Sequence, residues 1–137
     1  MPALDRGSET TSDAPARELV DAGAALITAL DAAGASPDVA FWLWFANAGE
    51  WRLLLAEGRL LQYGSRIALS RIRRMLTGDG EYEPLSPDLI GVSDGDAPAV
   101  KVLRSALWTG PGIHDLRIRD NVLNGVRVRR AYVYRIA

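Results

Sequence analysis

The segment LRIRDNVLNGVRVRRAYVYRI, residues 116–136, predicts a β-hairpin and decides the fold class. Apolar and charged residues alternate on both sides of Asn124-Gly125, as they do in two strands joined by a tight turn. A three-residue loop at 123–125 would pair Val122 with Val126 and sort the side chains onto two distinct faces. A two-residue Asn124-Gly125 turn is the alternative, but under strict alternation it mixes the faces. We therefore expect the three-residue loop.

In that register one face of the hairpin is apolar and the other is basic. Asp120 and Arg130 would then lie as diagonal neighbours on the apolar face. Phosphate contacts require a cluster of cations, so the basic face is a candidate anion- or nucleic-acid-binding site. Its four members are Arg117, Arg119, Arg127 and Arg129.

An acidic segment offers a structural alternative for these arginines. Residues 79–96 carry six acidic and no basic side chains, whereas residues 97–137 carry eight basic and two acidic ones. Such asymmetry is typical of an anion-binding face, but the two segments could equally neutralise each other in the fold. Which reading holds depends on whether the arginine face is open or covered.

A second hairpin is predicted at residues 39–46 and 50–57, joined by the loop Asn47-Ala48-Gly49. The three-residue loop would pair Trp44 with Arg52 and leave both faces of the hairpin apolar. A hairpin of that kind is usually covered on both sides. If it is not covered, Trp42 and Trp44 would form an interface patch, for example in a homodimer.

Three helices are predicted at about residues 14–33, 65–77 and 96–107, with a short strand at about 89–93 between the last two. Asp13, Ser65 and Asp96 are candidate N-caps for them. The element order is α-β-β-α-β-α-β-β. It predicts an α+β fold with a mixed sheet of about five strands, because the middle strand is flanked by helical crossovers.

Composition restricts the classes to which this chain can belong. The 137 residues predict a single α+β domain at 13–137, preceded by a disordered tail at 1–12. The chain has no cysteine, which excludes disulfides and thiol chemistry, and no apolar run long enough to span a bilayer. The N-terminus lacks the pattern of a signal peptide, so we expect a cytoplasmic location and no membrane partner.

Two blocks of the sequence resemble a group of small bacterial proteins. The blocks are AFWLWFANAGEWRLLLAE, at 40–57, and LRSALWTGPGIHDLRIRDNVLNGVRVRRAYVYRI, at 103–136. The resemblance covers most of residues 16–136 and implies a shared fold unit. It implies no activity and no catalytic residues.

No motif predicts a catalytic, metal or cofactor site. Pro37-Asp38 with Glu50-x-Arg52 is similar to a nuclease motif, but Asp38 and Glu50 would lie at opposite ends of the hairpin. Glu57-x-Arg59 lies at the correct end, yet arginine cannot replace the lysine of such sites as a base. His114 is the only histidine and has no partners at metal-ligand spacing.

The sequence therefore favours a non-catalytic binding or regulatory module, with a homodimer as one form. A small protein that acts on nucleic acid through its arginine face is the alternative, and an enzyme acting on a small molecule is the third hypothesis.

Overall fold

A computed structural model describes residues 14–137 except 79 and 94. The expected disordered tail and the expected cap at Asp13 lie outside the described residues. The predicted α+β fold and its element order are confirmed. The elements, with two short 3-10 turns, are α2 (Arg17–Ala32), β1 (Val39–Phe45), β2 (Glu50–Ala56), η1 (Arg59–Leu61), α3 (Ser65–Leu76), η2 (Pro87–Leu89), β3 (Ile90–Ser93), α4 (Pro98–Ala106), β4 (Leu116–Leu123) and β5 (Val126–Ile136).

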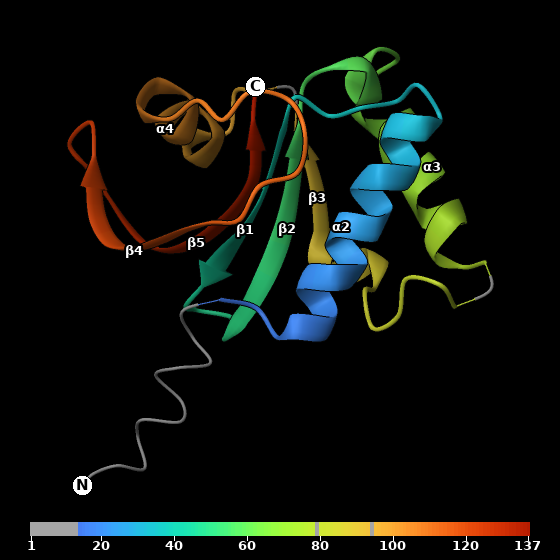
Figure 1. Ribbon diagram of the computed structural model, residues 1–137, viewed down its shortest axis with the longest axis horizontal. Coiled ribbons are helices and arrows are strands. Elements are labelled where there is room, and N and C mark those ends of the chain that lie inside the picture. The colour runs from blue at the N-terminus through green and yellow to red at the C-terminus, as the bar shows by residue number, and fades with distance from the viewer. Residues whose placement is uncertain (1–13, 79, 94) are drawn as a thin grey trace, which may run out of the picture.

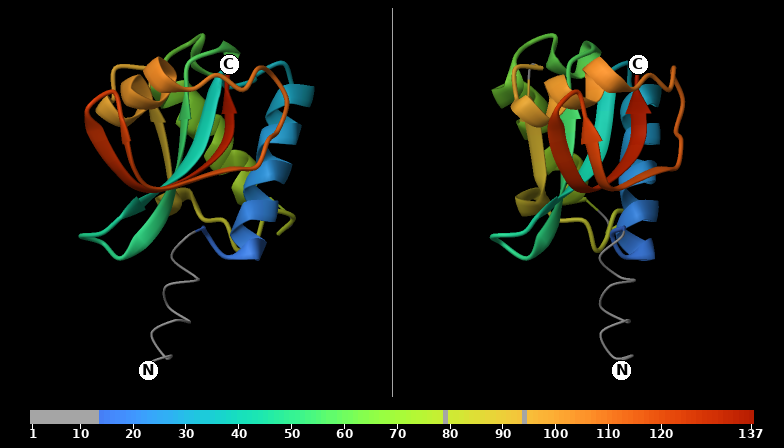
Figure 2. Two further views of the ribbon diagram at one scale, coloured as in Figure 1. Left: turned by 60° about the vertical axis from the view of Figure 1, so that its left-hand side comes forward. Right: turned by 90° about the vertical axis from the view of Figure 1, so that its left-hand side faces the viewer.

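The five strands form one mixed sheet in the order β3-β2-β1-β5-β4. Only β2 and β3 run parallel, because the chain returns from β2 to β3 through α3. Helices α2 and α3 lie on one side of the sheet, and α4 lies on the other, where the β4–β5 hairpin curls around it (Figures 1 and 2).

Two apolar clusters occupy the two faces of the sheet. The first packs α2 and α3 against Trp42, Leu53 and Tyr134. The second packs α4 against the opposite face, with Phe41 and Val133 at its centre. Both faces of β1 are therefore buried. Of the two alternatives for this hairpin, the structure shows the one in which both faces are covered.

A hydrogen-bond relay fastens α2 to the sheet. Trp42 Nε1 donates to Tyr134 Oη over 2.8 Å, and Tyr134 Oη donates to the carbonyl of Val20 over 2.6 Å. Burial raises the pKa of the Tyr134 hydroxyl well above its usual range, so the hydroxyl stays protonated and can donate. A Cβ at Gly23 would lie 2.4 Å from that hydroxyl, which explains a glycine inside the helix.

The predicted register of the first hairpin is wrong by one residue. Phe45 pairs with Glu50 and Trp44 with Trp51, so four residues, 46–49, form the loop. Gly49 does take the expected left-handed conformation, with φ +65°. The shift places Trp51 on the face of Trp42 and Trp44 and moves Arg52 to the opposite face. Because both faces are apolar, the pattern of side chains could not fix the register.

The predicted loop of the second hairpin is also wrong. Leu123 pairs with Val126, so the turn is the two-residue alternative, with positive φ at Asn124 and Gly125.

An irregularity at Asp120 removes the objection to that turn. Asp120 has φ +48° and is missing from the ladder between the two strands. The strands change phase there, so that Ile118 and Leu123 both reach the second apolar cluster, although an odd number of positions separates them. Because of this phase change, the hairpin can have a two-residue turn and still keep its apolar side chains on the face toward α4. The phase change also puts Tyr134 on the face opposite Val128.

Neither Ser65 nor Asp96 caps its helix. The N-cap residues are Gly64 and Ala97, and neither makes a side-chain capping bond.

Candidate nucleic-acid interface

The four predicted arginines are open to solvent. Arg117, Arg119, Arg127 and Arg129 are all exposed, and the side chains of Arg117 and Arg127 are each 56% accessible. The described residues of the acidic segment, 80–93, 95 and 96, do not cover them. They lead into and follow β3, and β3 and β4 form opposite edges of the sheet, which at the usual strand spacing are about 19 Å apart. The described part of the acidic segment therefore does not neutralise this face.

The arginines lie on a two-stranded extension of the sheet. Pairing between β1 and β5 ends at Leu43 and Ala131, whereas β4 and β5 stay paired as far as Leu123 and Val126. The part of the hairpin beyond β1 has its concave side on α4, and Asn124 Nδ2 donates to Ser105 Oγ from the turn. This hydrogen bond and the second apolar cluster join the hairpin to α4.

A fifth arginine and two aromatic rings belong to the same surface. Arg130 pairs with Arg119, and its guanidinium lies 5.6 Å from the ring centroid of Trp44. Arg117 pairs with Tyr132 and lies 5.7 Å from its ring centroid. We call the five residues Arg117, Arg119, Arg127, Arg129 and Arg130 the arginine hairpin.

Sequence reasoning missed this arrangement, because it placed Arg130 on the apolar face of the hairpin. The spacing of Tyr132 two residues after Arg130 was the available signal, but the three-residue loop assigned those two residues to the wrong face.

Arg127 and Arg117 each form an ion pair with an aspartate. Arg127 pairs with Asp120, in place of the predicted contact between Asp120 and Arg130, and Arg117 pairs with Asp115 over 3.6 Å. All four side chains are more than half exposed, and such surface pairs are weak and screened by salt. Residues 116–130 carry five arginines and one aspartate, so this hairpin is strongly basic in a chain of net charge −1.

Tyr132 stays a neutral hydroxyl beside these charges. Burial of the ring and, less strongly, the negative charge of Asp115 raise the pKa of Tyr132.

The two tryptophans proposed as an interface have different environments. Trp42 is fully buried and makes the relay to Tyr134, so it belongs to the core and offers nothing to a partner. Trp44 is partly exposed and meets Trp51 edge-on at 5.6 Å. Of the proposed patch, only Trp44 remains available, and the guanidinium of Arg130 lies over its ring.

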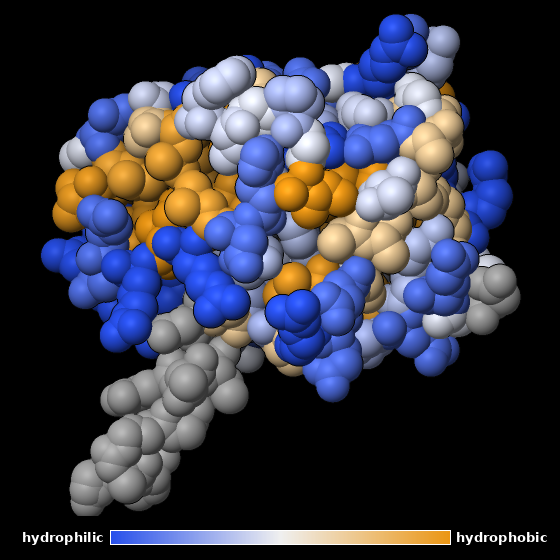
Figure 3. Space-filling model, viewed as in Figure 1, coloured by the Kyte–Doolittle hydropathy of each residue, from blue (hydrophilic) through white to orange (hydrophobic). Residues whose placement is uncertain are grey.

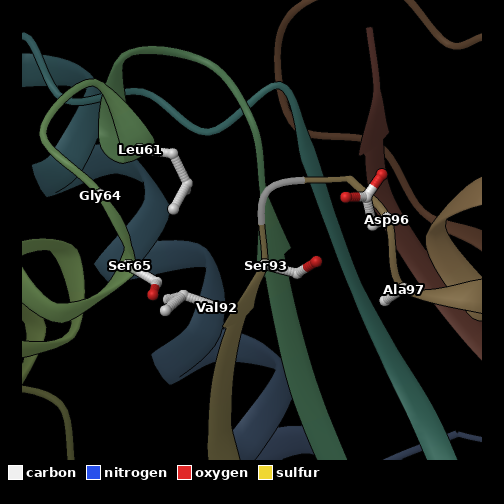
Figure 4. Close-up of a pocket in the computed structure, with 7 residues that line it drawn as sticks. All are labelled: Leu61, Gly64, Ser65, Val92, Ser93, Asp96 and Ala97. Carbon is white, nitrogen blue, oxygen red and sulfur yellow. The ribbon is translucent and has the colours of Figure 1, made fainter.

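The pocket drawn in Figure 4 is a second concave feature. It has a volume of about 620 Å³ and lies between the N-terminal ends of α3 and α4 and the end of β3. Its polar side chains are Ser65, Ser93 and Asp96. Among the described residues that line it there is no histidine to act as a base and no cationic side chain to hold an anion. The third hypothesis, an enzyme, therefore gains no catalytic pair from this pocket.

Asp38 and Glu50 of the nuclease-like set are not brought together, whereas Glu57 lies at the same end of the hairpin as Asp38. Glu50 pairs with Phe45 at the far end of β1 from Asp38, as the sequence predicted. Glu57 forms an ion pair with Arg104 over 2.6 Å. His114 contacts the carbonyl of Pro111 over 3.0 Å. Within residues 14–137, leaving aside 79 and 94, no three His, Cys, Asp or Glu side chains are grouped to hold a metal ion.

Comparison with protein-family models, with curated proteins and with solved structures finds no match to this chain. The resemblance to the group of bacterial proteins therefore stays a prediction. In the part of the chain that the structure describes, none of the helices has the length and apolarity to cross a membrane.

Proposed function

We propose that this chain is a non-catalytic binding module that holds nucleic acid on its arginine hairpin. The observation that carries the proposal is the exposure of the arginines at the sheet edge opposite the acidic segment. A cytoplasmic location, where nucleic acid is accessible, is part of the same proposal.

The shape of the hairpin favours contacts with the phosphate backbone. Its concave side is occupied by α4, so the ribbon cannot enter a groove with both faces, and its convex side would lie along the phosphates. Arginine forms two parallel hydrogen bonds to a phosphate, which suits an exposed guanidinium on a paired strand. Recognition of this kind depends little on base sequence.

The proposal predicts how strongly the binding constant depends on salt concentration. Three to five phosphate contacts would give log K against log salt a slope of about −3 to −4.5 on duplex DNA. Raising the salt from about 50 to about 200 mM would then weaken binding by about two orders of magnitude.

The test is fluorescence anisotropy with labelled 20-nucleotide single strands and duplexes at several salt concentrations. The double variant Arg119→Glu/Arg129→Glu should lose most of the affinity and reduce the salt slope by about 2. The matched control is Arg71→Glu/Arg73→Glu, which makes the same charge change at exposed positions on α3. We expect this control to keep the wild-type slope, because α3 lies on the other side of the molecule from β4 (Figure 1).

Equal losses in both double variants would show that only net charge matters and would contradict a defined interface. Absence of salt-sensitive binding to any of the probes would contradict the proposal itself.

A further inference from the structure

A groove opens where β1 and β5 separate. It has a volume of about 350 Å³, and its apolar walls come from three elements: Leu43 of β1, Val102 and Leu103 of α4, and Val126 and Val128 of β5. Apolar residues also gather where α4 meets the curled hairpin in Figure 3. The groove adjoins the convex surface proposed for nucleic acid, and Arg127, Arg129 and Arg130 of the arginine hairpin line it.

Two strand edges face each other across this groove without a partner between them. The ladder between β1 and β5 ends at Leu43 and Ala131, and β5 continues for five residues, 126–130, paired only with β4. Within the described residues no other strand lies against that edge. Its length of about 16 Å would admit four or five residues of an extended chain.

The two sides of the gap have different chemistry. Toward α4 lie the apolar walls, with Leu103 almost fully buried behind them. Toward the other side lie Trp44, Arg127 and Arg130, which also line the groove. A strand in this gap would present alternate side chains to the apolar wall and to the arginines.

We infer that the groove binds an extended segment of another protein in which apolar and acidic residues alternate. The segment adds a strand to the free edge of β5, its apolar side chains pack against α4, and its carboxylates pair with Arg127 and Arg130. This inference goes beyond nucleic-acid binding, because it depends on the apolar wall and the strand edge.

The probe is a fluorescein-labelled peptide GGVEVEVEGG, compared with GGVKVKVKGG and with the block isomer GGVVVEEEGG. The alternating acidic peptide should bind at least about tenfold more tightly than either of the other two. Amide hydrogen exchange measured by NMR should slow at alternate residues of 126–130 when that peptide is bound, because strand addition pairs those backbone groups.

Two variants at exposed apolar residues isolate the groove. Val126→Glu places a carboxylate in the groove, and Ile67→Glu makes a matching change on α3, at a residue that does not line it. Val126 and Ile67 are 46% and 54% exposed, so neither change should unfold the domain. We expect Val126→Glu to weaken the acidic peptide at least about tenfold and Ile67→Glu to stay within about twofold of wild type.

Four results would overturn the inference. They are no binding of the alternating acidic peptide, equal losses in the two variants, binding without slowed exchange at 126–130, and a dimer of the free protein that Val126→Glu dissociates. The last result would assign the groove to a second copy of the chain. Tight binding of decanoate with no binding of the peptide would assign it to small amphipathic anions.

Discussion

Replacing Tyr134 with phenylalanine should destabilise the domain far more than the loss of one hydroxyl suggests. The hydroxyl accepts from Trp42 Nε1 and donates to the carbonyl of Val20, and both tyrosine and tryptophan are buried. Phenylalanine would keep the ring and leave a donor and an acceptor without partners in a region closed to water.

The magnitude follows from those two groups. Each unsatisfied buried group costs about 1–3 kcal/mol, so the free energy of unfolding should fall by about 2–4 kcal/mol when some relaxation is allowed. For a domain of this size, about 4 °C per kcal/mol gives a decrease in Tm of about 8–16 °C.

Urea unfolding followed by far-UV circular dichroism measures this change. We expect a lower midpoint with an unchanged m value, because the surface exposed on unfolding is the same. The control is Tyr63→Phe at a side chain 69% exposed, which should change stability by less than about 0.5 kcal/mol. A double-mutant cycle with Trp42→Phe should give a coupling of about 1 kcal/mol or more.

A change of less than about 0.5 kcal/mol for Tyr134→Phe would refute the reasoning. It would mean that water reaches the relay, or that α2 is fastened to the sheet by apolar packing alone.

Two further predictions concern the same helix. Gly23→Ala should destabilise the wild type by about 1–3 kcal/mol, because the new Cβ would lie 2.4 Å from Tyr134 Oη. The loss of stability should be smaller in the Tyr134→Phe background, where that hydroxyl is absent. Equal losses in both backgrounds would contradict the clash. Asp31 binds the buried Arg135 through both carboxylate oxygens, and the side-chain hydrogen bond from Arg135 holds the pKa of Asp31 below its usual value. A lowered folded-state pKa stabilises the fold above pH ~4, the range of the unfolded carboxyl, and that stability is lost as the pH falls further. The free energy of unfolding should therefore fall more steeply between pH ~5 and ~3 in the wild type than in Asp31→Asn, and parallel curves would contradict the pairing.

The sequence predicted the elements well where local chemistry sets them. The helix from Ser65 has its apolar residues at helical spacing, and the predicted range, 65–77, is within one residue of the observed one. Gly34 ends the first helix in the left-handed conformation, as expected of a C-terminal glycine. The shared face of Arg117 and Arg119 is predictable for the same reason, since alternation along one strand places both side chains on one side.

The registers were wrong because they depend on more than local chemistry. Trp44 could face either layer, since helices cover the sheet on both sides and each face of the hairpin is apolar. The phase change at Asp120 is invisible in the pattern of side chains, because an aspartate in a strand gives no sign of its φ angle.

By itself, the sequence determined the α+β class, the element order and the basic character of residues 116–130. Only the tertiary structure decided that the acidic segment and the arginines lie at opposite edges, that Trp42 is core, and that β5 separates from β1 to leave a groove. The physical reason is that periodicity reports which side of its own strand a residue occupies. Strand order and pairing arise from contacts between segments far apart in the chain, where burial of the whole core selects one arrangement.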